Sequence, residues 1–313
     1  MNLGPGIALR REFLSELFER VSRGDSQVIS RLKWIEVMPE NFLARSEGGT
    51  GARGGHLRGG ITERALRGIA EAIPVALHGV SLSVGGADPL DQEYLAALAK
   101  MARELRARWV SDHLCYSSAG GVQLHNLLPL PLTRKALRHV VARVKRVQTR
   151  LSVPFALENA SYYGELVGSE VGEAEFLSEV VARTGCGLIL DINNVYVNCF
   201  NRAARGGGAV RALSAHALEA GREFLRGLPL DRVIEVHIAG HKQIKLGGKP
   251  ALLDTHGAAV IEPVRELLRE LNRLQSVGTL LLEREQELPP LDEILGELDG
   301  LWGEVSGGGV VGS

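Results

Sequence analysis

The sequence predicts an α/β fold, a closed (β/α)8 TIM barrel, on three observations. Short apolar runs alternate with longer amphipathic segments along the chain, as is typical of βα units in a parallel sheet. Eight such units occur in 313 residues, which suits a (β/α)8 barrel. No glycine-rich phosphate fingerprint follows the first apolar run, so a doubly wound open sheet ranks second.

The eight predicted strands are short runs rich in apolar and β-branched residues. They are GIAL (6–9), WIEVMP (34–39), PVALHG (74–79), RWVSDHL (108–114), VPFALEN (153–159), CGLILDIN (186–193), RVIEVHIAG (232–240) and GTLLLER (278–284).

One amphipathic helix is predicted after each of the eight strands. These helices cover residues 11–21, 61–73, 90–107, 133–151, 173–185, 211–227, 263–274 and 290–302. We therefore expect one barrel domain over residues 1–303 and a disordered tail over 304–313, where SGGGVVGS ends the chain. The glycine-rich stretch 47–60 is expected to be a flexible loop and GGG (206–208) a loose insertion, both on the site side of the barrel.

Composition argues against several classes of partner. The 36 basic and 37 acidic residues leave a net charge of −1, so we expect no nucleic-acid partner. No apolar run reaches the roughly 18 residues that a membrane span requires. Three cysteines in no paired motif, and a start that lacks a signal-peptide pattern, favour reduced thiols in the cytoplasm.

Metal-binding side chains stand at the carboxyl ends of nearly all predicted strands, where TIM barrels form their active sites. Glu36 and Asp112 also lie near strand ends. The strongest candidates for metal ligands are His78, His113, Glu158, Asp191, His237, Asp254, His256 and Glu283.

The alternation of the strands supports this interpretation. In PVALH, Ala76 and His78 share a face, and in FALE, Ala156 and Glu158 do, so small residues lie one layer below the polar ones. A single polar residue at a strand end is more often structural than a ligand. Several carboxylates in one barrel mouth, however, would repel each other without a counter-charge, and a divalent cation supplies it.

The donor types narrow the choice of metal. Imidazoles and carboxylates without a thiolate argue against a cysteine-type structural zinc site and favour Fe, Mn or catalytic Zn. Eight donors suffice for two ions, or for three if carboxylates bridge, and Glu158 is the natural bridge. The residues expected to orient the ligands through hydrogen bonds are Asn159, Asn193, Asn194 and His241. The cluster of Lys242, Lys245 and Lys249 reads as a solvated loop, or alternatively as a clamp for a substrate carboxylate or a partner.

These segments resemble those of the DUF692 proteins, also called multinuclear non-haem iron-dependent oxidases. The resemblance covers about residues 4 to 295. The matching segments, in order, are GIALR, IEVMPENF, LHGVSLSVGGADPLD, VSDHLCYS, HNLLPLPLT, LENASYY, GCGLILDINNVYVN, VHIAGH, LLDTHGA and LLLERE.

The resemblance implies a xylose-isomerase-like barrel that holds two or three iron ions, as Fe(II) or Fe(III), and uses dioxygen as co-substrate. Members modify ribosomally made precursor peptides, often at cysteine, and commonly act with a partner protein that recognises the leader. The same eight residues form the implied ligand pool, with Asn193 a weaker candidate. We assign Glu158, Asp191 and His237 to catalysis.

Two alternatives stay open. One is another enzyme on the same barrel, either a divalent-metal sugar isomerase or a metal-dependent hydrolase such as a phosphodiesterase. The other is a metal-storing or metal-sensing protein without catalytic activity. The segments 47–60 and 202–216 look longer than the usual connections of the family, which leaves the identity of the substrate open.

Overall fold

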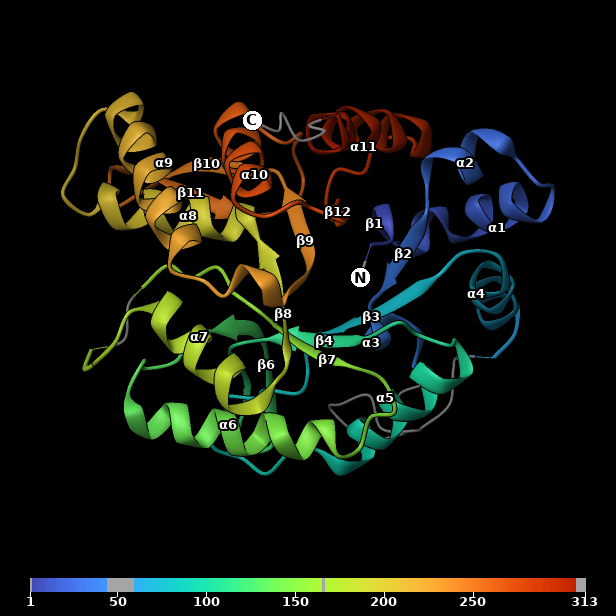
Figure 1. The fold of residues 1–313 in the computed structure, drawn as a ribbon, viewed down its shortest axis with the longest axis horizontal. Coiled ribbons are helices and arrows are strands. Elements are labelled where there is room, and N and C mark those ends of the chain that lie inside the picture. Colours follow the sequence, from blue (N-terminus) through green and yellow to red (C-terminus); the bar gives the residue numbers. More distant parts are fainter. Residues whose placement is uncertain (1, 44–58, 165–166, 308–313) are drawn as a thin grey trace, which may run out of the picture.

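The computed structural model describes residues 2–43, 59–164 and 167–307 (Figure 1). Eight parallel strands close into a barrel in the order β1-β12-β9-β8-β7-β4-β3-β2, so the predicted fold is confirmed. All eight predicted strands are present, with ends that differ from prediction by two residues or fewer. They are β1 (Gly4–Ala8), β2 (Trp34–Val37), β3 (Val75–Gly79), β4 (Val110–His113), β7 (Phe155–Glu158), β8 (Gly187–Asp191), β9 (Val233–Ala239) and β12 (Thr279–Glu283).

The eight predicted helices also form, and they surround the barrel. They are α1 (Leu14–Ser22), α4 (Ile61–Ala72), α5 (Gln92–Glu104), α6 (Arg134–Gln148), α7 (Glu173–Thr184), α9 (Val210–Arg226), α10 (Glu262–Leu274) and α11 (Leu291–Ser306). Side-chain caps explain several starts: Asp91 accepts from the backbone of Glu93 and Tyr94, and Thr133 accepts from that of Ala136. The remaining short helices are η1 (Arg11–Phe13), α2 (Ser26–Arg31), α3 (Pro39–Phe42) and η2 (Leu230–Arg232).

One further helix, α8 (Ile192–Ala204), was not predicted. Its sequence, INNVYVNCFNRAA, is rich in asparagine and β-branched residues, which are weak helix formers. Packing overrides this propensity, because ten of its residues are buried and Asp191 caps its first turn by accepting from Asn194. The glycines of GGG (206–208) lie in the connection 205–209 that separates α8 from α9, so the rest of the segment 202–216 is helical.

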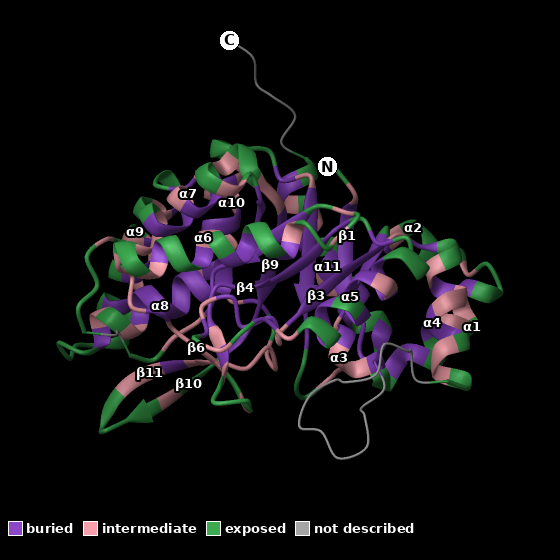
Figure 2. Ribbon diagram, turned by 90° about the horizontal axis from the view of Figure 1, so that it is seen from below, coloured by how far each residue is buried: buried purple, intermediate pink, exposed green. Residues whose placement is uncertain are grey.

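Two antiparallel hairpins, also not predicted, follow the carboxyl ends of β4 and β9. The first joins β5 (Tyr116–Ala119) to β6 (Val122–Leu128), and the second joins β10 (His241–Leu246) to β11 (Lys249–Asp254). Figure 2 shows β6, β10 and β11 at one end of the barrel, with the β10–β11 hairpin projecting from it. Their polar sequences lack the apolar runs by which the barrel strands were found.

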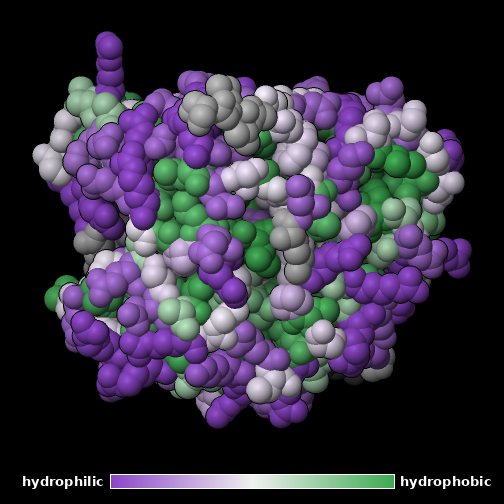
Figure 3. Space-filling view, in the orientation of Figure 1, coloured by the Kyte–Doolittle hydropathy of each residue, from purple (hydrophilic) through white to green (hydrophobic). Residues whose placement is uncertain are grey.

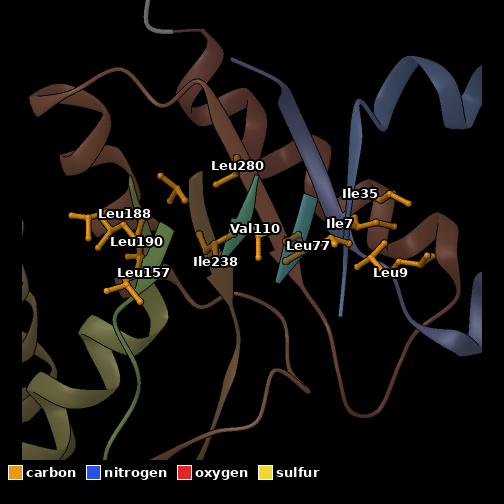
Figure 4. Packing of buried hydrophobic residues seen from close by; sticks show 14 of the residues in the cluster. Ile7, Leu9, Ile35, Leu77, Val110, Leu157, Leu188, Leu190, Ile238 and Leu280 are labelled. Atoms are coloured by element: carbon orange, nitrogen blue, oxygen red, sulfur yellow. The ribbon is translucent and has the colours of Figure 1, made fainter. Parts of the chain in front are cut away.

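Two separate hydrophobic cores hold the barrel together. Figure 4 shows part of the larger one, in which strand residues such as Ile7, Leu77 and Val110 face the surrounding helices. The smaller core fills the barrel itself and consists of Ala8, Trp34, Ala76, Trp109, Ala156, Ile189 and Leu281. Ala76 and Ala156 thus lie beneath His78 and Glu158, as their alternation predicted. This packed layer lies directly beneath the cluster of polar side chains described below.

The boundary predicted for the tail was wrong, because α11 continues through Ser306. Residues 308–313 and most of the glycine-rich stretch 47–60 lie outside the described residues. Hydrophilic side chains cover most of the face in Figure 3, with smaller hydrophobic patches between them. Among the described helices, none combines the length and the hydrophobicity that crossing a membrane would take.

Candidate metal centre

Three strands bring His78, His113 and Glu158 together at the carboxyl end of the barrel. Nε2 of His78 lies 2.8 Å from Oε2 of Glu158, and Nε2 of His113 lies 3.2 Å from the same oxygen. All three side chains are buried. Their converging donor atoms form the first group that could bind one ion.

Glu158 also belongs to a second group, with Asp191, His237 and Glu283. One donor atom from each residue lies within 4.8 Å of the others. Nδ1 of His237 is 3.4 Å from Oε1 of Glu158 and 3.5 Å from Oε2 of Glu283. Since its two oxygens face different groups, Glu158 has the geometry of a carboxylate that bridges two ions.

A third group consists of His256, Glu283 and Glu285. Nδ1 of His256 is 3.4 Å from Oε2 of Glu283, and its Nε2 is 2.8 Å from Oδ1 of Asp254. His256 has φ of 50°, a left-handed conformation that is costly for a non-glycine residue and is often found at functional sites. The structure therefore brings all eight predicted ligand candidates into one connected cluster.

Two of the residues in this cluster, Arg10 and Glu285, were missed by the sequence analysis. Nη2 of Arg10 lies 2.6 Å from Oε1 of Glu285 and 3.8 Å from Oε1 of Glu283, and Nε donates to the carbonyl of Arg284. Arg10 is buried and ends the segment GIALR, which was noted only as part of a motif. It supplies a fixed positive charge at the edge of the third group.

Two further carboxylates lie beneath His237. Its Nε2 is 3.0 Å from Oε1 of Glu235 and 3.2 Å from Oε2 of Glu36. Trp109 donates from Nε1 to the other oxygen of Glu235, at 2.9 Å. Glu36 was noted near a strand end but not selected, and Glu235 was not considered at all. Its signal was present, because Glu235 precedes His237 by two residues and so shares its face of the strand.

Asp112, also noted near a strand end, lies outside the cluster. It accepts from the backbone N–H groups of Leu82 and His113, at 2.9 and 2.7 Å. The alternation of β4 directs His113 into the barrel and its neighbour Asp112 away from it, toward the β3 loop.

Backbone and hydroxyl acceptors orient the imidazoles of the first group. Nδ1 of His113 lies 3.3 Å from the carbonyl oxygen of Gly79, to which it can only donate. Nδ1 of His78 lies 2.9 Å from Oγ of Ser111, whose own proton can reach the carbonyl of Leu77. Both arrangements place the proton on Nδ1 and leave the lone pair of Nε2 facing Glu158, as a metal ligand requires.

The asparagines behind the cluster hold its acidic members. Asn159 accepts from the N–H of Asp191 and donates to the carbonyl of the same residue, at 3.0 and 2.9 Å. Asn194 donates to the carbonyl of Asn159, at 3.0 Å. Asn193, in the first turn of α8, donates to Oδ1 of Asp254, at 2.7 Å. His241 donates to Oδ1 of Asn193, also at 2.7 Å, and belongs neither to the three groups above nor to the one that Glu36, Glu235 and His237 form.

Without bound ions, burial and neighbouring charges shift the pKa values of several residues in this cluster far from their ordinary values. Burial raises the pKa of Asp191 well above its ordinary range, and the charge of Glu158 adds to the effect. Burial lowers the pKa of His78, but the charges of Glu36 and Glu158 outweigh it and raise that pKa to about 10. Burial and Glu36 raise the pKa of Glu235 to about 7. Such opposed shifts are common at functional sites.

Several buried donor atoms in the cluster make no hydrogen bond within the described part of the chain. They are Oε2 of Glu36, Oε2 of Glu158, Oδ2 of Asp191, Nδ1 of His237 and both ring nitrogens of His256. Buried polar atoms rarely go without a partner, because leaving one unsatisfied is costly. Bound divalent cations would satisfy these atoms and balance the carboxylates. The residues therefore fit a cluster of metal ions with nitrogen and oxygen ligands.

Comparison with solved structures gives the same fold. A xylose isomerase domain protein from Planctomyces limnophilus matches with a TM-score of 0.52 and 13% sequence identity, covering 98% of this chain and 100% of that one. The IOLI protein, solved with a zinc atom, matches with a TM-score of 0.51 and 14% identity, covering 97% and 98%. The xylose-isomerase-like form of the barrel is confirmed.

Comparison with known sequences identifies the family. A UPF0276 protein of Anaeromyxobacter sp. (strain Fw109-5) is 38% identical over 295 residues, which cover 94% of this chain and 90% of that protein. One from Neisseria meningitidis serogroup C (strain 053442) is 36% identical over 294 residues, covering 94% and 92%. The family model for the RiPP precursor modification enzymes MbnB/TglH/ChrH matches residues 4–302, so the chain belongs to this family of enzymes that modify ribosomally made precursor peptides.

Proposed function

We propose that this enzyme is a multinuclear iron-dependent oxidase that uses dioxygen to modify its precursor peptide, most simply at a cysteine. The observation that carries the proposal is the set of converging, buried nitrogen and oxygen donors arranged around Glu158, several of which make no hydrogen bond within the described residues. Mixed imidazole and carboxylate sets suit iron, and Glu158 can bridge two ions. Two or three ions would be bound.

Ions bound here would supply the activation of dioxygen and the deprotonation of a coordinated thiol. The residues of the chain have the other tasks. Ser111 and Gly79 hold the imidazoles of His78 and His113 in the tautomer that binds metal. Glu158, Asp191 and His237 surround the place where the reaction occurs, and the packed layer beneath them excludes water from that side.

A substrate cysteine fits this site because the protein brings no thiolate of its own to it. The chain's three cysteines are all buried, and burial raises the pKa of Cys115 well above its usual range. In the proposal, a partner protein that binds the leader presents the peptide, and the reaction takes place in the cytoplasm.

The test begins with protein purified without oxygen. Its metal content is measured, and oxygen uptake is followed after adding Fe(II) and the peptide encoded by a neighbouring short, cysteine-containing open reading frame. Two or three irons per chain, with oxygen uptake and a mass change in the peptide, are the expected result. The same peptide with its cysteines changed to serine is the control and should stay unmodified.

Other outcomes would favour the alternatives. One or two Zn, Mn or Mg ions, sugar or phosphodiester turnover and no oxygen uptake would favour an isomerase or hydrolase. Tightly bound metal without turnover of any of these substrates would favour metal storage or sensing.

A further inference from the structure

The base of the β10–β11 hairpin lies beside the candidate metal centre. His241, the first residue of β10, pairs with Asp254, the last residue of β11. Asn193 joins the same two side chains, because it accepts from His241 and donates to Asp254. The hairpin then projects away from the barrel, as Figure 2 shows. A ligand bound along the hairpin would therefore have one end close to the cluster.

The two outer edges of this hairpin are unlike each other. On β11, the side-chain amide of Asn201 from α8 bonds both the N–H and the carbonyl of Leu252, at 2.8 and 2.9 Å. The hydroxyl of Tyr163 accepts from the N–H of Asp254, at 3.0 Å. The β11 edge is therefore covered by the rest of the protein.

The β10 edge is open. Leu252 directs its peptide groups outward to Asn201, so its partner Gln243 directs its own outward on the opposite side, and Lys245 does the same two residues along. No hydrogen bond to the peptide groups of Gln243 or Lys245 is present within the described residues. Both residues are exposed. We call these outward-facing peptide groups of Gln243 and Lys245 the β10 edge.

The charge around the β10 edge is positive. Residues 241–249 read HKQIKLGGK, with three lysines and no acidic residue. Lys242 and Lys245 are exposed on β10 itself, and Leu246 at its tip is 63% exposed. Lysines on an open edge also discourage aggregation between copies of a protein. Protection from aggregation does not explain, however, why the open edge begins at the candidate metal centre while the β11 edge is covered.

We propose that the β10 edge binds an acidic, extended segment of the precursor peptide as an added strand. Peptide backbone supplies the donors and acceptors that the β10 edge lacks, and acidic side chains would pair with Lys242 and Lys245. A strand rises about 3.4 Å per residue, so four residues cover the distance of about 14 Å from Lys245 to His241. The inference rests on the proposed function only in taking a peptide as substrate.

The direct test measures the binding of synthetic peptides and needs no turnover. The first probe is a short fluorescein-labelled peptide of Glu and Val with Glu on both faces of the extended strand, because Lys242 and Lys245 project from opposite faces of β10. The second replaces each Glu with Gln, and the third carries methyl groups on alternate peptide nitrogens of the acidic sequence. Fluorescence anisotropy is followed with the metal-loaded enzyme. The acidic probe should bind most tightly, and methylation of its backbone should weaken binding at least about tenfold, which equals about 1.4 kcal/mol.

Two variants locate the binding. Gln243→Pro removes one outward N–H at a position where an edge strand tolerates proline, and should weaken binding of the acidic probe about tenfold. Gln243→Thr keeps that N–H and is the matched control. Lys242→Glu combined with Lys245→Glu should abolish binding, whereas Lys135→Glu with Lys145→Glu, on exposed positions of α6, should not. Unchanged melting temperature and metal content confirm that each variant is folded.

Failure would be unambiguous. Absence of binding by the acidic probe, equal binding of the methylated probe, or equal binding by Gln243→Pro would each overturn the proposal. None of these results depends on the metal being iron or on oxygen uptake, so a failed oxidase assay leaves the test of the β10 edge intact.

Discussion

Nε2 of His237 lies 3.0 Å from Oε1 of Glu235, on the side of the imidazole ring away from Glu158. The ring therefore connects two layers of the barrel interior. A proton on Nε2, donated to the carboxylate below, leaves the lone pair of Nδ1 for a metal ion above. Trp109 holds that carboxylate from its other side. The tautomer of His237 thus depends on Glu235, which is not one of the eight ligand candidates.

Glu235→Gln should weaken metal binding at the His237 position about 10- to 100-fold. A glutamine cannot accept from both Trp109 and His237, since one of its two side-chain atoms is an amide donor. Placing that donor against Nε2 would move the proton of His237 to Nδ1. Titration of the metal-free variant with Fe(II) or Co(II) measures the effect, and His139→Gln, on the outer helix α6, is a control for loss of an imidazole elsewhere. Wild-type affinity in Glu235→Gln would contradict this role.

Glu158→Ala should cost more metal per chain than His113→Ala does. Glu158 contributes to two of the groups, whereas His113 contributes to one. Elemental analysis of both variants, loaded and desalted in parallel, gives the comparison, and far-ultraviolet circular dichroism checks the barrel. Equal losses from the two variants would show that Glu158 does not bridge.

Glu173 should make the protein less stable as the pH rises. Burial raises its pKa to about 7, above the value of about 4.5 in the unfolded chain, although the hydroxyl of Tyr162 donates to it. The folded state therefore holds the proton more tightly, and stability falls between about pH 4.5 and 7 and is level above that. The loss should be on the order of 2 kcal/mol, because Glu173 remains partly exposed.

Glu173→Gln keeps the hydrogen bond from Tyr162 and removes the titration. The difference in unfolding free energy between wild type and variant, measured by urea denaturation across this pH range, should follow the expected curve. A difference that does not change with pH would rule out the raised pKa.

Gly6→Ala should destabilise the barrel by about 1–3 kcal/mol, through overpacking of its interior. An added Cβ at Gly6 would lie 2.4 Å from Cε2 of Trp34, whose indole is buried between strands. Gly300→Ala in α11 is the matched control, since nothing lies within 4 Å of its Cβ position. In the interior of that helix, alanine should stabilise by about 0.5–1 kcal/mol. A Gly6→Ala variant as stable as the wild type would mean that Trp34 moves aside freely.

The barrel and the end at which its site lies were predictable from sequence. Strands such as FALE and VIEVHIA carry their signal locally, in apolar runs whose period of two also separates inward from outward residues. The helix α8 was not predictable in the same way, because its asparagines and β-branched residues become helical only through burial against neighbouring elements. The two hairpins were not predicted for another reason, which is that their polar sequences lack the apolar runs of the barrel strands.

The sequence by itself determined the eight βα units and the polar residues at the strand ends, because both depend on short-range periodicity and on the rule that strand ends gather at one mouth. Only the tertiary structure decided which of these residues lie close enough together to share an ion. It showed that Glu158 joins two groups, that Glu235 and Glu36 sit under His237, and that Arg10 reaches Glu285. These relations arise from the register between strands and from packing across the barrel, which involve residues far apart in the chain.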